Sequence, residues 1–365
     1  MTELSSRQFI LVALFVGITS KLMSMPIEIY KLAHNDAIFT IILGLVVELA
    51  IVILVAHLIK KYPHTRLIDL LKEHFGSIIA YTVIVLLYLL IIVKLFFALE
   101  EVYTFFKEFL YDYFNPVIFG LAMFFVVGYL SYKGARTLGR TLEILFPIIM
   151  IGLLITLISN VEFLKFTKML PYLTTGVLPT LDSFVHNAFY FGNALPLLFF
   201  VGKVRIDDNF IKKVTLSYSG LIAFVAIFSF MFYDLFGYGT ILAIFALSDY
   251  SQYNPYILDL QRLNWLSIIV NVTKLFCSAS LLLYCLGQAG KMLTHAQSSF
   301  WPIVVSFGIN FFIAAVVSYD MDTIKYLVNL FISYYTIALI LIVLILTLIL
   351  CIKKEAKCPK HYSIK

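Results

Sequence analysis

Gly17-Ile18-Thr19-Ser20-Lys21, followed by Pro26, interrupts the first long apolar stretch of the sequence. Gly, Thr and Ser weaken a helix, proline cannot continue its hydrogen bonding, and a charged side chain is costly at bilayer depth. A second apolar stretch, close to half the chain away, is interrupted in a similar manner by Phe191-Gly192-Asn193-Ala194 and then Pro196. These two stretches predict helices that unwind at corresponding positions in two halves of the chain.

The composition places both interruptions in a membrane. Hydrophobic residues make up 62% of the 365 residues and charged residues only 13%, against about 25% in ordinary globular chains. A soluble fold of this size could not bury so much apolar surface. We therefore expect one transmembrane domain over residues 1–365. The net charge of +6 is scattered between apolar segments, which argues against nucleic-acid binding.

Windows of about 20 apolar residues recur along the whole chain, and each is long enough to cross a bilayer. Lys and Arg are about three times as abundant in one set of alternate loops as in the other, which predicts that both termini are cytoplasmic. The ten expected spans run roughly over 7–32, 37–59, 77–104, 115–132, 141–159, 181–202, 214–236, 264–286, 299–318 and 327–352.

Five spans in each half force two repeats into opposite membrane orientations. Repeat 1 would cover about 7–159 and repeat 2 about 181–352, with a cytoplasmic tail at 353–365. Paired Gly/Pro-interrupted segments in such halves indicate the binding site of a secondary transporter. The expected fold is therefore an all-α membrane protein with a LeuT-type 5+5 inverted repeat and broken helices 1 and 6. Ordinary proline kinks are the alternative, since transmembrane helices tolerate them.

Several charged residues lie within the spans and require partners or roles. The Lys21 ammonium could replace a bound sodium ion, neutralise an anionic ligand, or form a salt bridge to span 3 or span 8. Glu48 has no obvious local partner, and the roles of Lys94 and Lys274 stay open. Near the end of span 5, Glu143 is expected to pair with Arg140, one helical turn away.

The sequence has no constellation of residues typical of an enzyme. HExxH and Walker A patterns are absent, and the four cysteines lack metal-binding spacing. We therefore expect no catalytic residues, no metal and no cofactor.

Motifs along nearly the whole chain resemble those of the spore germination permeases. These proteins are the B subunits of nutrient germinant receptors and belong to the amino acid–polyamine–organocation superfamily. The stretches that bear the resemblance are Ser5-Ser6-Arg7-Gln8-Phe9, Met23-Ser24-Met25-Pro26, Tyr62-Pro63, Leu67-Ile68-Asp69-Leu70-Leu71, Phe75-Gly76, Gly134-Ala135-Arg136, Gly139–Pro147, Leu260-Gln261-Arg262-Leu263 and Lys353-Lys354.

The resemblance implies a nutrient-sensing subunit in the spore inner membrane, assembled with an A subunit and a lipoprotein C subunit. It would bind a small germinant such as an amino acid between helices 1, 3, 6 and 8. The resemblance assigns ligand contacts to Gly17, Thr19, Ser20, Gly192 and Asn193, and position alone adds Lys21, Phe191 and Ser278. Many members have a Gly-x-Gly-like stretch in place of Thr19-Ser20-Lys21, which leaves the ligand's identity open.

Two other functions compete with the sensor. A proton-coupled secondary transporter for an amino acid or amine would need the same interrupted helices. A scaffold or ion conduit without a ligand would leave those interruptions unexplained.

Overall fold

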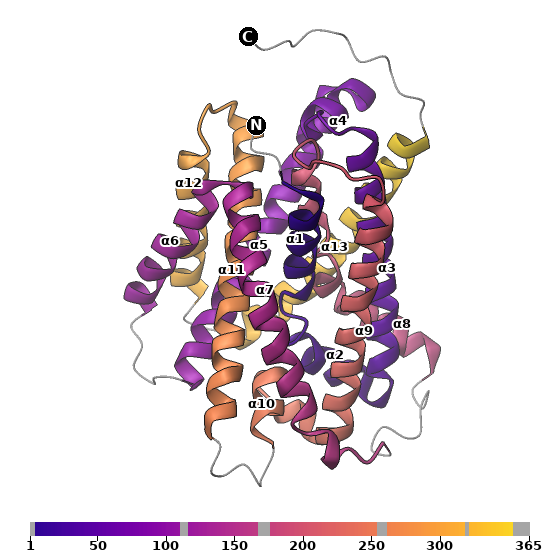
Figure 1. Cartoon of the computed structure of the whole chain (residues 1–365), viewed down its shortest axis with the longest axis vertical. Coiled ribbons are helices and arrows are strands. Elements are labelled where there is room, and N and C mark those ends of the chain that lie inside the picture. The colour runs from indigo at the N-terminus through magenta and orange to yellow at the C-terminus, as the bar shows by residue number, and fades with distance from the viewer. Residues whose placement is uncertain (1–3, 110–115, 167–175, 254–260, 318–320, 353–365) are drawn as a thin grey trace.

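The computed structural model describes residues 4–109, 116–166, 176–253, 261–317 and 321–352, and these residues form an all-helical bundle (Figure 1). The expected tail at 353–365 lies outside the described residues. In chain order, with η denoting a 3-10 helix, the elements are α1 (Ser6–Ile18), α2 (Met25–Ala33), η1 (His34–Asp36), α3 (Ala37–Lys61), α4 (Leu67–Phe75), α5 (Ser77–Phe109), α6 (Pro116–Lys133), α7 (Ala135–Ile158), η2 (Val161–Phe163), α8 (Val177–His186), η3 (Ala188–Phe191), η4 (Leu195–Phe200), α9 (Phe210–Phe236), η5 (Gly237–Leu242), α10 (Ala246–Gln252), α11 (Gln261–Thr294), α12 (Phe300–Val317) and α13 (Met321–Ile352).

Most of these helices are long and apolar. Within the described ranges, six helical stretches are long and apolar enough to cross a membrane: Met25–Lys61, Ser77–Glu108, Ala135–Phe163, Phe210–Leu242, Leu266–Thr294 and Leu330–Ile352. Four shorter apolar helices cover Ser6–Ile18, Ile118–Lys133, Ala188–Phe200 and Phe300–Ile313. Because lipid offers no hydrogen bonds to the backbone, a helix is the way for such sequences to satisfy their peptide groups.

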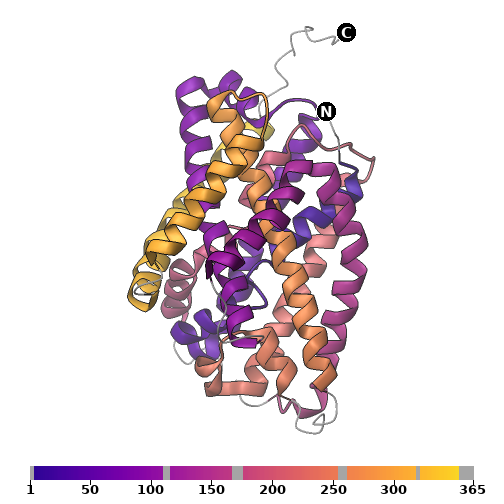
Figure 2. The same cartoon turned by 90° about the vertical axis from the view of Figure 1, so that its left-hand side faces the viewer.

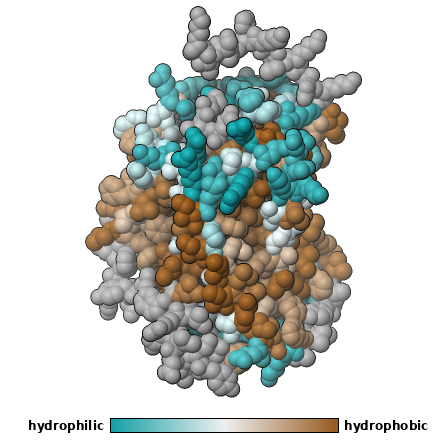
Figure 3. Space-filling view, viewed as in Figure 1, coloured by the Kyte–Doolittle hydropathy of each residue, from teal (hydrophilic) through white to brown (hydrophobic). Residues whose placement is uncertain are grey.

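The outer surface of the bundle is suited to lipid. Phe125, Ile144 and Trp301 each leave 69–70% of their surface exposed. On the face drawn in Figure 3, hydrophobic residues form a broad band across the middle, and most of the hydrophilic residues lie at the upper end. Soluble monomers rarely expose apolar surface on this scale, so the protein is an integral membrane protein.

The hydrophilic end gathers the loops that are rich in Lys and Arg. Leu4 pairs with the segment after η4, donating to Lys203 O at 2.8 Å and accepting from Arg205 N at 2.8 Å. The Lys61 ammonium at the end of α3 donates to the Leu350 and Cys351 carbonyls near the end of α13, at 2.9 and 3.0 Å. Segments from both ends of the chain therefore meet at one end of the bundle.

Helix α11 lies in the interior of the bundle, where it packs against α5, α7, α12, α6 and α1. Figure 2 shows α11, in orange, running along the length of the molecule beside α7. On the opposite side, α3 packs against α9, α13 and α8. The short elements α1, α2, η3 and η4 thus lie between two groups of long helices.

One expected ion pair at the basic end is wrong. The Glu143 carboxylate accepts from Gln8 Nε2 at 3.1 Å and lies 3.9 Å from Arg7 Nε, in place of the expected Arg140. The helical spacing of Arg140 and Glu143 permitted a local pair, but the N-terminus of α1 packs against α7 and supplies nearer partners. This contact fixes the start of α1, where Ser5 and Gln8 form a capping box.

Candidate functional site

The chain leaves the α-helical conformation between α1 and α2. Residues Thr19–Ser24 form turns, and Ser20 adopts a left-handed backbone with a φ of 59°. Backbone groups freed by these turns find new partners in α10. Leu247 N donates to Leu22 O at 2.9 Å, and Ala246 N donates to Met23 O at 3.0 Å. The start of α10 therefore stabilises the turn, because it satisfies carbonyls that a continuous helix would have used itself.

The second interrupted stretch is irregular over a longer distance. After α8 ends at His186, the backbone runs through η3, the Gly192-Asn193 pair and η4. Gly192 is required by packing, because a Cβ at this position would lie 2.5 Å from Thr336 Cγ2 on α13.

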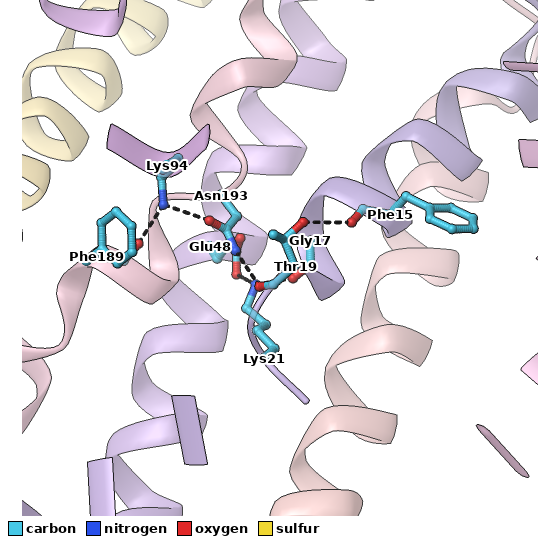
Figure 4. Close-up of polar contacts among 8 residues, drawn as sticks. All are labelled: Phe15, Gly17, Thr19, Lys21, Glu48, Lys94, Phe189 and Asn193. Carbon is cyan, nitrogen blue, oxygen red and sulfur yellow. Dashed lines mark hydrogen bonds and ion pairs between the residues drawn. The ribbon is translucent and has the colours of Figure 1, made fainter. Parts of the chain in front are cut away.

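Asn193 joins the two interrupted stretches (Figure 4). Its Nδ2 donates to Thr19 O at 3.0 Å, while its Oδ1 accepts from the Lys94 ammonium on α5 at 2.7 Å. Lys94 also donates to Phe189 O at 2.6 Å and lies over the Phe189 ring, 4.2 Å from its centroid. The two stretches, far apart in sequence, thus share one buried polar cluster.

Lys21 forms an ion pair with Glu48 on α3, and neither side chain is exposed. Its ammonium also donates to Gly17 O at 2.5 Å, where the end of α1 leaves a carbonyl free. The expectation of a partner in span 3 or span 8 is therefore wrong, since α3 corresponds to span 2. Figure 4 shows Glu48 between Lys21 and the Asn193–Lys94 pair.

Glu101 on α5 is a site residue that the sequence analysis did not single out. Only 5% of its surface is exposed, and its carboxylate accepts from Ser20 Oγ at 2.9 Å and from Ser24 Oγ. Lys94 and Glu101 are seven residues apart and so share one face of α5, a spacing that could have placed Glu101 beside the interrupted stretches.

Lys274 on α11 is fully buried near this carboxylate. Its ammonium has no hydrogen-bond partner among the described residues. The Glu101 carboxylate is close enough to attract it electrostatically.

The remaining expected residues contribute packing and backbone contacts. Ser278 Oγ donates to Phe15 O at 3.2 Å, and Thr19 Oγ1 donates to the same carbonyl at 3.1 Å. Gly17 allows α9 to approach, because a Cβ on it would lie 2.6 Å from the Tyr218 hydroxyl.

Phe191 is fully buried and stacks on Phe184, with ring centroids 5.8 Å apart. It also packs against α3 at Gly44, where a Cβ would lie 2.4 Å from its ring.

The cluster is closed to solvent in this conformation. Thr19, Ser20 and Asn193 expose 6%, 7% and 6% of their surfaces, and Ser278 exposes none. Among the described residues, no group of three or more His, Cys, Asp or Glu side chains could hold a metal ion. The cluster thus consists of hydroxyls, an amide, two carboxylates and three ammoniums, which a ligand could reach only after the helices move.

Solved structures with the same arrangement of helices are transporters. A crystal structure of MhsT in complex with L-phenylalanine matches with a TM-score of 0.59 and 14% identity over 94% of this chain and 97% of that one. Two variants of a manganese transporter from Eremococcus coleocola match with TM-scores of 0.59 and 0.58 at 12% identity, over 95% of this chain and 78% of theirs. These neighbours are LeuT-fold transporters of the amino acid–polyamine–organocation type, and identities this low show a common fold alone.

No curated protein matches the chain. The family model described as "Spore germination protein" matches residues 3–323, which is nearly the whole chain. This match confirms the resemblance seen in the sequence motifs. The chain belongs to the spore germination protein family.

Proposed function

We propose that this chain is the membrane subunit of a spore germinant receptor, which binds a small amino acid-like nutrient where the two interrupted stretches meet. In this proposal α1–α2 and α8–η4 are the broken helices 1 and 6 of a 5+5 inverted repeat. The ligand site lies between them, α5 (span 3) and α11 (span 8). The protein works in the spore inner membrane with A and C subunits, and its basic end faces the cytoplasm, as the positive-inside rule favours.

The hydrogen bond between Asn193 and Thr19 is the observation on which the proposal chiefly depends. It joins two stretches, 174 residues apart, that both lack regular helix at the middle of an apolar bundle. Irregular backbone at membrane depth is tolerated where protein buries it or where it lines a cavity. In a nutrient sensor, this position allows a ligand to act on both stretches at once.

The charges around the cluster favour a zwitterionic ligand. In the part of the chain that the structure describes, the Lys274 ammonium has no hydrogen-bond acceptor, and an enclosed ammonium is stabilised by a carboxylate. Glu48 and Glu101 supply carboxylates for the ligand's own ammonium. A free amino acid provides both charges, whereas an amine or an acid provides one. The likeness to the fold of MhsT, solved with L-phenylalanine, supports the same class of ligand.

Binding would act by a shift between two conformations. The cluster is closed in the structure, so a ligand enters from a conformation in which α1–α2 or α8–η4 has moved. A ligand that interacts more strongly with the closed state shifts the population toward that state. The turn at Thr19–Ser24 and the irregular stretch around Gly192 are the segments that can absorb such a movement.

Spores that lack the gene, complemented with variants, test this proposal. Asn193→Ala removes both hydrogen bonds of the amide, whereas Asn209→Ala removes an exposed amide before α9 that makes no capping bond. With a panel of single amino acids as germinants, we expect Asn209→Ala to restore the response and Asn193→Ala to lose it at equal protein level. A normal response from Asn193→Ala would contradict the proposed site.

A proton-coupled amino acid or amine transporter is the second candidate. The observation that favours it is the buried set of titratable groups, Glu48, Glu101 and Lys274, at membrane depth, where such residues often belong to proton relays. Proteoliposomes that contain this chain alone would distinguish the two. Concentrative uptake of a labelled amino acid driven by an imposed pH gradient indicates a transporter, and binding without accumulation indicates a sensor.

A further inference from the structure

A cavity at the basic end of the bundle shares no lining residue with the cluster around Asn193. Its volume is about 380 Å³, within the range of small-molecule pockets. The first turns of α4 and α7, the segment after η4, and the end of α11 with the loop that follows form its walls. Its charged and titratable lining residues are Arg66, Asp69, Lys72, Lys203, Tyr284, Lys291 and His295.

The positive charges in this cavity are not matched by protein carboxylates. Asp69 is the one acidic side chain in the lining. Among the described residues, no ion pair within 4.0 Å includes Arg66, Lys72, Lys203 or Lys291. Four basic side chains, Arg66, Lys72, Lys203 and Lys291, thus share the cavity with one carboxylate.

Two of these cations are held by neutral oxygens. Lys203 donates to Gln288 Oε1 at 2.7 Å and to the Tyr284 hydroxyl at 3.1 Å. Lys72 donates to the Tyr81 hydroxyl at 2.8 Å, and that hydroxyl lies 3.0 Å from His295 Nε2. These contacts fix the ammonium positions without neutralising their charge.

The charged form of Lys203 is destabilised in this arrangement. Its pKa is lowered to about 7, chiefly by burial; the Cys285 thiol opposes this shift, and the nearby charges of Arg66 and Lys291 add to it. The other titratable groups around the cavity are Asp69, Lys72, Tyr284 and His295. An anion bound among these cations would favour the charged form of Lys203.

Two helix N-termini add peptide N–H groups to the same wall. α4 begins after Arg66 and α7 begins after Gly134, and in neither helix does the residue before the first turn make a side-chain capping bond. Ile68, Asp69 and Ala135, from these first turns, line the cavity. N–H groups at the start of a helix, together with its dipole, favour a negative group.

We propose that this cavity binds a phosphate-bearing dianion, presented either by the headgroup of an acidic phospholipid or by a soluble phosphate monoester. A dianion leaves the site close to neutral after the Asp69 charge is counted. Arg66 provides the planar donors that match phosphate oxygens, and Lys203 and Lys291 provide point charges beside it.

Binding to the full-length chain in phosphatidylcholine nanodiscs tests the soluble source. The probes are inorganic phosphate and glycerol phosphate, titrated by calorimetry. We expect Arg66→Gln and Lys291→Gln each to weaken binding at least tenfold. Lys60→Gln, an exposed lysine at the end of α3 outside the cavity, should leave the affinity unchanged. Circular dichroism and gel filtration of each variant confirm that it is folded.

Nanodiscs that contain phosphatidic acid test the lipid source. Native mass spectrometry should find phosphatidic acid retained by the wild type and by Lys60→Gln, and lost from Arg66→Gln and Lys291→Gln. Retention of the lipid without binding of glycerol phosphate assigns the site to a lipid headgroup, and the converse assigns it to a soluble anion. The proposal is overturned if the wild type and the two cavity variants bind the soluble phosphates with the same affinity and retain phosphatidic acid equally.

The pH dependence of sulfate affinity distinguishes a role of Lys203 in anion binding from a purely structural role. Its charge stays at two between pH 6 and 8, so a change in its affinity over this range reports on the protein. We expect sulfate to bind more tightly as the pH falls, because Lys203 becomes protonated. In Lys203→Gln this dependence should weaken, and an unchanged dependence would contradict the role of Lys203.

Discussion

The ammonium of Lys21, in the turn between α1 and α2, forms an ion pair with the carboxylate of Glu48 in the middle of α3. Neither side chain is exposed. A charge in the interior is tolerated when a partner of opposite charge and further hydrogen bonds accompany it. Here the Gly17 carbonyl, left free by the end of α1, provides one of those bonds. The irregular backbone and the ion pair therefore depend on each other.

Removing one member of this pair should cost much more stability than removing both. Lys21→Met leaves the Glu48 carboxylate buried without its cation, and we expect a loss of about 3–5 kcal/mol. In the double variant Lys21→Met/Glu48→Gln no net charge is left behind, so a large part of that loss should be recovered. Chemical unfolding of the purified protein in detergent, arranged as a double-mutant cycle, measures the coupling.

The exposed pair of Lys31 and Glu28 is the control for this cycle. Lys31 Nζ lies 2.7 Å from Glu28 Oε1, but 43% of the Lys31 side chain and 35% of the Glu28 side chain are exposed. Lys31→Met should change stability by about 0–1 kcal/mol, as for other surface ion pairs. If Lys21→Met proves no more damaging than Lys31→Met, the buried pair does not hold the turn in place.

A second prediction concerns the contact between Phe191 and α3. A Cβ at Gly44 would lie 2.4 Å from the Phe191 ring, so Gly44→Ala should destabilise the protein by about 1–3 kcal/mol through overpacking. Phe191→Leu makes room and should reduce that loss in the double variant. Gly220→Ala in α9, where nothing lies within 4 Å of the new Cβ, should raise stability by up to about 1 kcal/mol. If the stability losses of Gly44→Ala and Phe191→Leu are additive in the double variant, the two residues are not in the tight contact that the structure shows.

The membrane class, the helical fold and the family could all be predicted from the sequence. Composition and the length of the apolar windows determine the first two, and motifs along nearly the whole chain indicate the third. Thr19–Ser24 and Gly192-Asn193 lie outside α-helices in the structure. Local chemistry made this expectation possible, because glycine, proline and small polar residues disfavour a helix whatever surrounds them.

The partners of the buried charges could not be predicted in the same manner. A salt bridge to span 3 or span 8 was one of three roles considered for Lys21, and Glu101 was not singled out. The contacts of both residues depend on how the helices rotate against one another. The periodicity of a single helix does not determine that rotation. The ion pair of Lys21 required α3 to present Glu48 toward the turn, a consequence of packing against α9 and α13. Only the helical spacing of Lys94 and Glu101 offered a local signal.

The two hydrogen bonds of Asn193 can be separated by Asn193→Asp. An aspartate retains an acceptor for the Lys94 ammonium but has no donor for Thr19 O. We expect this variant to be more stable than Asn193→Ala, because the Lys94 contact becomes charge-assisted. We also expect it to respond to germinant as poorly as Asn193→Ala, because the link between the two stretches is lost. Thermal unfolding and germination assays give the two readouts, and a full response from Asn193→Asp would assign the amide's role to Lys94 alone.

The last prediction concerns the pH dependence of stability at the basic end. Burial lowers the pKa of Lys203 in the folded protein to about 7, from an ordinary value of 10.5. Between these two values the unfolded chain binds a proton that the folded protein does not, so the free energy of unfolding should rise with pH through this window. Below pH 7 Lys203 is protonated in both the folded and the unfolded state, and the cost of the buried charge is present in full.

Lys203→Met should therefore flatten the rise in stability between pH 7 and 9.5, measured in a buffer without sulfate or phosphate. Lys212→Met, which replaces an exposed lysine on α9, should leave the rise intact. Adding sulfate to the wild type should flatten the same rise, because a bound anion keeps Lys203 protonated in the folded state. A slope that is identical in the wild type and in Lys203→Met would show that this lysine does not titrate in the window.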